Sequence, residues 1–339
     1  MSEIDFTNII GFTLSQLKTE FAKIGLTNLD AKRVFPWIHT KSARSFDIMS
    51  DVPLKVRKIL EENYSIKIPN CVTLQKSRDG TKKALLKLWD ENCIETVFIP
   101  EEKRSTVCVS SQIGCAVGCK FCYTGTQNFV RNLTSSEIIA QILFWNESVT
   151  NIVFMGMGEP LLNFENLASA LELLLEERAH NFSRHKITVS TSGIIENAIF
   201  DLAKFGVKLA ISLHASNDET RSRIMPINNK YNIKTLINAA EEYQRNSNTD
   251  HVTFEYLLLK GINDSDANAI ELSRLLRSIP SKVNLITFNS WPGSPFIGSS
   301  YDHAHRFAKI LLGKGIRTIV RKSRGDDVLA ACGQLKGKK

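Results

Sequence analysis

The chain has 339 residues, of which 43% are hydrophobic and 23% charged, and its formal net charge is +8. This composition is typical of a soluble globular protein with one large domain or two ordinary ones. The longest apolar runs are too short to cross a bilayer, and the amino terminus lacks a signal-peptide pattern, so we expect a cytoplasmic protein without a membrane partner. The positive charge favours an anionic partner, with RNA first.

Residues 1–70 are predicted to form a small helical accessory domain. Apolar side chains recur at helical spacing from Phe12 to Ile24, with Thr13 or Ser15 as the cap and Gly25 as the stop. Two more apolar series follow, and basic residues accompany all three segments. Such a domain fits either a solvated helical face or a module that binds RNA.

Residues 71–100 have the character of strands rather than helices. Three β-rich segments are separated by turn signals at Asp79-Gly80 and at residues 90–92. Glu95 lies in the third segment, where the alternation lets its side chain face solvent or the interior. We therefore expect a β extension between the helical domain and the rest of the chain.

Strand-like and helix-like segments alternate through residues 101–323. This alternation predicts an α/β fold with a parallel sheet or barrel, whose ligands bind at the carboxyl ends of the strands. The expected strands are 105–110, 151–155, 186–191, 207–213, 252–258, 283–288 and 317–321, and the expected helices are 135–146, 164–177, 194–205, 233–246, 264–277 and 301–314.

Three cysteines with the spacing C-x3-C-x2-C follow the first of these expected strands. Cys115, Cys119 and Cys122 are close enough in sequence to serve one metal centre from one loop. A cubane iron–sulfur cluster with three protein ligands would leave one iron open to a substrate. Structural zinc usually takes four ligands, often as two C-x2-C pairs, and three inert buried thiols would be the remaining explanation. The odd total of seven cysteines fits a reducing compartment.

Phe121 completes the pattern C-x3-C-x-aromatic-C, which is similar to that of the radical S-adenosylmethionine (SAM) superfamily. Further segments resemble the RlmN/Cfr family of RNA methyltransferases, although Tyr123 stands where that family commonly has a small residue. The resemblance implies an incomplete (β/α)6 barrel at 101–323, preceded by the helical domain at 1–70 and the β extension at 71–100, and followed by a tail at 324–339. The segments that carry the resemblance are 154–161, 190–193, 212–214, 225–228 and 324–335.

The resemblance also implies the cofactors and their ligands. One 4Fe-4S cluster would be held by the three cysteines of the loop, and two SAM molecules would be used per turnover. Read alone, the residues that match SAM-binding positions would be ordinary turn and strand-end residues. They are Gly158, Glu159, Ser190, Ser212, Leu213, His214 and Asn289.

Catalytic roles follow from the same resemblance for three residues that could otherwise be structural. Cys332 would accept a methyl group and become S-methylcysteine, because carbon 2 of adenine is not nucleophilic enough for direct transfer. A 5′-deoxyadenosyl radical would activate that methyl group for addition to the ring. Glu95 would take the ring proton, and Cys108 would release the product through a transient disulfide with Cys332.

The implied substrates are an adenosine in the peptidyl transferase centre of 23S rRNA and the adenosine next to the anticodon of some tRNAs. A Cfr-type enzyme that methylates carbon 8 is the alternative, and a non-catalytic RNA-binding or metal-storage protein is the third. We expect a monomer served by a reductant such as flavodoxin or ferredoxin. Candidate phosphate ligands are Arg104, Lys120, Arg131, Arg321, Lys322, Arg324 and residues 336–339.

Overall fold

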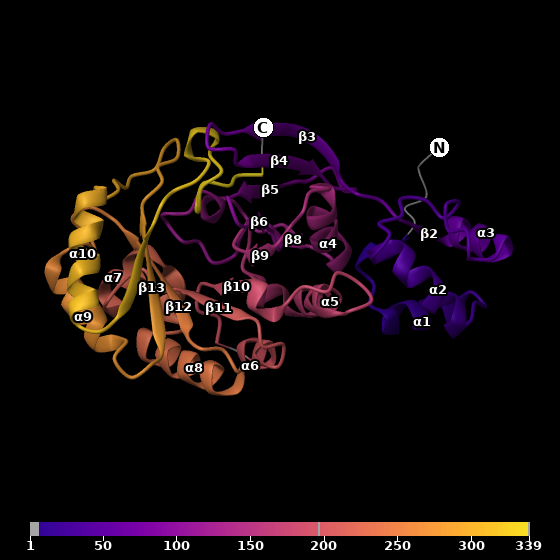
Figure 1. Ribbon diagram of the computed structural model, residues 1–339. Coiled ribbons are helices and arrows are strands. Elements are labelled where there is room, and N and C mark those ends of the chain that lie inside the picture. Colours follow the sequence, from indigo (N-terminus) through magenta and orange to yellow (C-terminus); the bar gives the residue numbers. More distant parts are fainter. Residues whose placement is uncertain (1–6, 196, 338–339) are drawn as a thin grey trace.

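One long sheet organises the computed structural model, which describes residues 7–195 and 197–337. Its strand order is β14-β13-β12-β11-β10-β9-β6-β5-β4-β3, so the sheet ends on β14 and β3 and does not close. Figure 1 shows this curved sheet with helices along its outer side and the amino-terminal helices beside it. Among the described residues, no helix is long and apolar enough to cross a membrane.

The amino-terminal region is helical, as the sequence predicts. Thr13, and not Ser15, caps its first helix by accepting from the Gln16 amide, and Gly25 follows that helix with a φ of +74°. Its elements are β1 (Thr7–Asn8), α1 (Leu14–Lys23), α2 (Asn28–His39), α3 (Leu54–Asn63) and β2 (Tyr64–Ser65).

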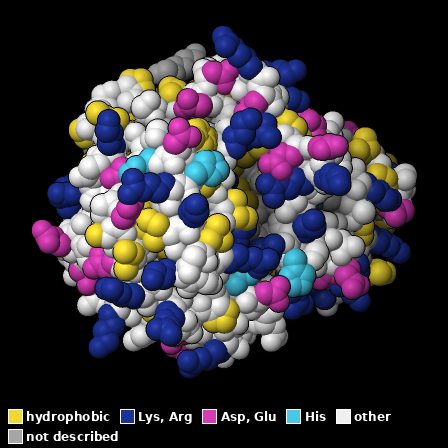
Figure 2. Space-filling view, turned by 60° about the vertical axis from the view of Figure 1, so that its left-hand side comes forward, with side chains coloured by type: hydrophobic (Ala, Val, Ile, Leu, Met, Phe, Trp, Pro, Cys, Tyr) yellow, Lys and Arg dark blue, Asp and Glu magenta, His cyan; other side chains and the backbone are white. Residues whose placement is uncertain are grey.

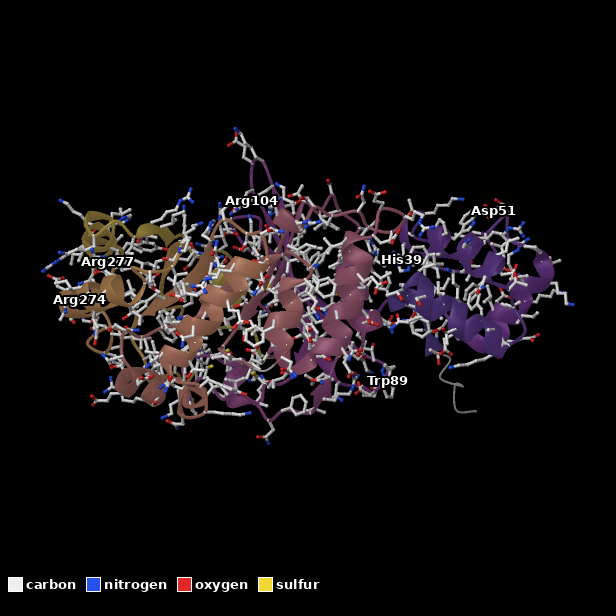
Figure 3. The ribbon with its side chains drawn as sticks, turned by 90° about the horizontal axis from the view of Figure 1, so that it is seen from below. His39, Asp51, Trp89, Arg104, Arg274 and Arg277 are labelled. Atoms are coloured by element: carbon white, nitrogen blue, oxygen red, sulfur yellow. The ribbon has the colours of Figure 1, made fainter. Side chains whose placement is uncertain are left out.

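This helical region packs tightly against the large domain. Gly11 has no room for a side chain, because a Cβ there would lie 2.1 Å from the Ser136 nitrogen. The Gly11 amide donates to Ser136 Oγ, which itself donates to the Asn8 carbonyl. His39 lies at the same junction (Figure 3), with its ring centroid 5.4 Å from that of His180. Burial lowers the pKa of His39 to about 3 and that of His180 to about 4, so both imidazole rings are neutral at neutral pH.

Three antiparallel strands then extend the edge of the sheet. β5 pairs with both β4 and β6, and its Val97 lies opposite Cys108. This pairing joins the expected β extension to the same sheet as the barrel strands. The strands are β3 (Asn70–Lys76), β4 (Lys82–Lys87) and β5 (Cys93–Pro100).

The remaining strands of the sheet are parallel neighbours, and six strand–helix pairs precede β14. The incomplete barrel predicted from the sequence is therefore confirmed. The strands are β6 (Ser105–Cys108), β9 (Asn151–Phe154), β10 (Ile187–Thr191), β11 (Lys208–Ser212), β12 (Val252–Leu258), β13 (Ser281–Thr287) and β14 (Arg317–Arg321). The helices are α4 (Ser135–Phe144), α5 (Phe164–Leu175), α6 (Asn197–Ala203), α7 (Asp218–Ile224), α8 (Ile233–Asn246), α9 (Asp266–Leu275) and α10 (Tyr301–Gly313).

Two local features differ from the sequence prediction. The strand expected at 105–110 ends at Cys108, because the Ser110 amide donates to the Gln141 side chain and its hydroxyl donates to the Glu95 carbonyl. Helix α7 was not expected; it is short and is capped by Asn217. A small hairpin of β7 (Gln112–Ile113) and β8 (Arg131–Asn132) encloses the cysteine loop.

Candidate active site

The three cysteines line one chamber above the carboxyl ends of the parallel strands. Their loop is shaped by Gly114 and Gly118, which have φ values of +72° and +69°, and a Cβ on Gly114 would collide with the Asn128 carbonyl at 2.1 Å. Burial raises the pKa of all three thiols, that of Cys115 to about 12.

The donor set of this chamber fits an iron–sulfur cluster. Soft thiolate ligands from one loop suit such a cluster, and bound iron would supply the positive charge that these buried thiols lack. Among the described residues, no three Cys, His, Asp or Glu side chains are placed to hold a single metal ion. Three thiols from one loop match a cubane that leaves one iron open, whereas structural zinc usually takes four ligands.

Glu159 follows β9 and is buried in the same chamber, with an exposed fraction of 1%. Burial raises the pKa of this carboxyl group, while hydrogen bonds of 2.7 Å from the amide and the hydroxyl of Ser192 oppose the rise. Gly156 and Gly158 let this loop pack closely against residues 110–112, because a Cβ on Gly158 would lie 2.5 Å from the Gln112 side chain. Glu159 is therefore a carboxyl group held in a fixed position in the chamber that the three cysteines line.

Ser190 and Ser212 lie at or next to the carboxyl ends of β10 and β11 and line the same chamber, together with His214. Nδ1 of His214 accepts a hydrogen bond from the Leu257 amide at 3.0 Å, so the neutral ring carries its proton on Nε2. Burial lowers the pKa of His214 to about 3. Leu213 is fully buried and presents its backbone to the neighbouring strand.

Arg221 fixes these strand ends and was missed by the sequence analysis. Its guanidinium is fully buried and donates to the carbonyls of Ser192, Ser212 and Leu213. It also donates to the Asn228 side chain at 2.9 Å, which gives the segment 225–228 a structural reason. No pattern around Arg221 in the sequence distinguishes it from the exposed Arg223 on the same helix.

A second cavity, of about 540 Å³, lies inside the barrel and meets the first one. Cys332 lines both cavities, whereas Cys108 lines only the second. Both are free thiols, and burial raises the pKa of Cys108 to about 12 and that of Cys332 to about 11. The side chain of Cys332 is accessible to solvent within these cavities, although protein surrounds the cavities. We call the smaller cavity at the cysteine loop the inner chamber. The larger cavity, which extends through the barrel away from that loop, is called the outer chamber.

Glu95 lies apart from both chambers, beneath the carboxy-terminal tail. Its Oε2 accepts from the Lys336 amide at 2.6 Å and from the Gly337 amide at 3.1 Å, and its Oε1 pairs with Lys83 Nζ at 2.9 Å. Leu335 separates this carboxylate from the chambers, since it lines both of them. The structure thus brings Glu95 to the tail that carries Cys332 but leaves both of its oxygens occupied.

Tyr123 anchors this tail. Its ring stacks on Trp291 with a centroid separation of 4.7 Å, and its amide donates to the Gly333 carbonyl at 2.7 Å. Lys336 Nζ lies 5.1 Å from the centre of the same ring. Asn289 lines the outer chamber, not the inner one, and donates to the Cys332 carbonyl.

The basic residues proposed for RNA differ in how free they are. Arg131 is paired with Asp90 and Glu137, and Arg104 with Glu101. The amide of Lys336 holds Glu95, while Lys338 and Lys339 lie outside the described residues. Lys120 is exposed on the cysteine loop, whereas Arg321, Lys322 and Arg324 line the outer chamber.

Comparisons with known proteins agree with this geometry. A family model for the radical SAM superfamily matches residues 109–272, and a model for the ribosomal RNA large subunit methyltransferase N-terminal domain matches residues 7–66. The chain is 43% identical to the dual-specificity RNA methyltransferase RlmN of Paracoccus denitrificans, over 97% of this chain and 89% of that one. It is 45% identical to the enzyme of the same name from Francisella tularensis subsp. mediasiatica, over 98% and 93%. A solved radical SAM methyltransferase from Sphaerobacter thermophilus superposes with a TM-score of 0.92 at 42% identity, and the match covers 98% of this chain and all of that one.

Proposed function

Because the chain belongs to the RlmN family of radical SAM RNA methyltransferases, we propose that it methylates carbon 2 of adenosine in two kinds of RNA. It is a SAM-dependent RNA methyltransferase with radical chemistry. The proposed targets are one adenosine in the peptidyl transferase centre of 23S rRNA and the adenosine next to the anticodon of some tRNAs. The relatives are named dual-specificity enzymes, which supports more than one RNA substrate.

The position of Cys332 carries this proposal. Its thiol faces both chambers, so one side chain is accessible from the cofactor side and from the nucleotide side. Cys108 lines the outer chamber and pairs through β6 with the strand of Glu95. A thiol at this junction can receive a methyl group from one ligand and deliver the carbon to another.

We propose that Cys115, Cys119 and Cys122 hold a 4Fe-4S cluster, and that two SAM molecules are used per turnover. Glu159 is suited to the amino group of SAM, while Gly158, Ser190 and residues 212–214 contribute the rest of its pocket. Asn289 contributes by holding the Cys332 loop. When bound, the cluster supplies the electron that cleaves SAM reductively.

Cys332 first attacks the methyl carbon of one SAM, so that a sulfur–carbon bond forms on its Sγ while the bond between the methyl group and the sulfonium breaks and S-adenosylhomocysteine leaves. One hydrogen of that methyl group passes to the 5′-deoxyadenosyl radical from the second SAM, and the carbon then bonds to carbon 2 of adenine, whose hydrogen leaves as a proton that Glu95 accepts. Cys108 then attacks Sγ of Cys332, which forms a disulfide and breaks the bond between Sγ and the product carbon. The thiol proton of Cys108 goes to the product carbon, and the one electron left over would return to the bound cluster. A thiol reductant resets the pair.

The tail must move for this sequence to run. The Lys336 and Gly337 amides occupy Oε2 of Glu95, and Lys83 pairs with Oε1, so the proposed base is free only when the tail shifts. The inner chamber, at about 120 Å³, is narrow while the tail covers it. We infer that binding of SAM and RNA displaces residues 335–337. The hydrogen bond from Tyr123 to Gly333 would keep the preceding part of the tail in place.

Product mapping tests the proposal. The protein is reconstituted anaerobically with iron and sulfide, supplied with SAM, a reductant and an unmodified 23S rRNA fragment, and the nucleosides are identified by mass spectrometry. We expect 2-methyladenosine. A product of 8-methyladenosine would overturn the assignment in favour of the Cfr-type alternative, which the named relatives do not support. We further propose a cytoplasmic monomer that takes electrons from a flavodoxin or a ferredoxin.

A further inference from the structure

The outer chamber extends to the end of the barrel opposite to the cysteine loop, where partly exposed basic side chains line it. Lys208 begins β11, Lys282 is the second residue of β13, and His251 directly precedes β12; all three line this chamber. Arg317 begins β14 and lies opposite Lys282 in the register of these two strands. We call Lys208, Lys282 and Arg317 the basic rim. None of the three was singled out by the sequence analysis.

The charges of the basic rim are not neutralised. In the described part of the chain, no carboxylate forms an ion pair with Lys208, Lys282 or Arg317, whereas Arg104 and Arg131 have such partners. Burial lowers the pKa of Lys282, and the nearby Arg317 and Lys208 add to this, while Glu255 opposes it. Burial also lowers the pKa of His251, the same three cations lower it further, and Asp250 opposes them. Cations that repel one another at the mouth of a cavity favour an anionic ligand.

The carboxylates inside the chamber do not cancel this charge. Glu255 lies deeper in the cavity, where its Oε1 accepts from Asn284 and its Oε2 lies 3.6 Å from Arg321. Glu101 is paired with Arg104. Figure 2 shows a hollow on the face turned forward, with Lys and Arg side chains on both sides of it.

The outer chamber connects the basic rim with the reactive thiols, because Lys208, Lys282, Cys108 and Cys332 all line it. Along β11, Lys208 lies four residues before Ser212, a rise of about 13 Å. The cavity volume of about 540 Å³ lies within the roughly 300–1,000 Å³ of ordinary ligand pockets. A nucleotide whose base reaches Cys332 would therefore leave its phosphate near the mouth of the chamber.

We propose that Lys208, Lys282 and Arg317 bind the RNA phosphates that flank the target adenosine, so that the RNA enters at the amino ends of the barrel strands. This inference rests on the proposed function, because it assumes an RNA substrate with an extruded base. Phosphate contacts of this kind position the strand without reading its sequence. The basic rim would serve 23S rRNA and tRNA alike, since both present the same backbone.

The test compares charge-removing variants in RNA binding. Lys208→Gln, Lys282→Gln and the double variant are reconstituted with the cluster, and the dissociation constant of a labelled 23S rRNA fragment is measured at several salt concentrations. We expect the double variant to bind at least tenfold more weakly at low salt, with a salt slope reduced by about 1 for each lost phosphate contact. Lys309→Gln, which removes an exposed charge on the outer helix α10, is the matched control and should bind as the wild type does.

Two further measurements keep the inference falsifiable. Lys282→Arg keeps the charge and should keep the affinity, whereas loss of affinity in this variant would indicate a structural role and overturn the inference. Wild-type affinity and slope in the double variant would also overturn it. Wild-type protein that binds RNA with rim-dependent affinity but forms no methyladenosine would refute the proposed function and support the basic rim.

Discussion

The inner and outer chambers meet at Cys332 but differ in charge. The inner chamber is lined by thiols with raised pKa values, by a neutral His214 and by Glu159. Its one lining cation, Arg321, is shared with the outer chamber and lies 3.6 Å from the carboxylate of Glu255. The outer chamber has unpaired cations at its mouth. The difference indicates that one cavity is built for a metal–sulfur cofactor with a zwitterionic ligand and the other for a polyanion. Cys332 lines both cavities and, under the proposed function, would act in both.

Removal of a proposed cluster ligand should distinguish the functions of the two chambers most clearly. We expect Cys115→Ser to form no methyladenosine, because the inner chamber would lose the iron that radical cleavage requires. Its affinity for RNA should stay within about twofold of the wild type, since phosphate contacts dominate that affinity. Iron content, nucleoside analysis and RNA titration check this; full iron loading with full activity would show that Cys115 is no ligand.

Cys332→Ala should abolish methylation while the protein keeps its iron and its RNA affinity, because only the carbon carrier is lost. The matched control is Cys71→Ala, which removes an exposed free thiol on β3 and should stay fully active. Nucleoside analysis of both variants decides the point. Activity in Cys332→Ala would refute the S-methylcysteine route.

Glu95→Gln should slow methylation by about 10²- to 10⁴-fold, the usual contribution of a general base. Glu147→Gln removes a carboxylate that pairs with Lys82 near the surface and should leave the rate unchanged. Single-turnover rates with RNA in excess are the appropriate measurement. A rate within threefold of the wild type would exclude Glu95 as the base.

Arg221 holds strand ends that line the inner chamber and does not line the outer one. Its replacement should therefore lower the stability of the protein and its affinity for SAM, without changing the charge of the outer chamber. Arg221→Met leaves the carbonyls of Ser192, Ser212 and Leu213 without their buried donor. Since each unsatisfied buried group costs about 1–3 kcal/mol, we expect a loss of at least about 3 kcal/mol in the free energy of unfolding. Arg223→Met on the same helix should change it by less than about 0.5 kcal/mol. Urea unfolding of the two variants provides the comparison.

Salt should act on one chamber and not on the other. If three phosphates contact the basic rim, a rise from 50 to 200 mM salt should weaken RNA binding roughly 20-fold. SAM cleavage without RNA should change little over the same range, because the inner chamber is buried and screened less. An equal response of both activities would contradict the division between the chambers.

The sequence predicts the inner chamber better than the outer one for a physical reason. The cysteines and the strand-end residues Ser190 and Ser212 are local signals, and a parallel sheet necessarily brings its carboxyl ends together. Lys208 and Lys282 are far apart in sequence and become neighbours only through the sheet order and the inward pleat. The cover over Glu95 could not be predicted, because a backbone amide of the tail leaves no trace in residue identity. The role of Tyr123 could not be predicted either, because its ring stacks on Trp291, a residue distant in the sequence.

The order of the chain has a consequence for the making of this enzyme. Residues 332 to 337 leave the ribosome after every strand of the sheet, yet they bring Cys332 to the chambers and their amides cap Glu95. A nascent chain therefore contains every strand of the barrel before it contains Cys332, the thiol proposed to carry carbon. A chain that ended before this segment would contain every strand of the sheet and the basic rim but would lack Cys332 and the amides that cap Glu95. The residues on which the proposed activity depends are thus completed only at the end of translation.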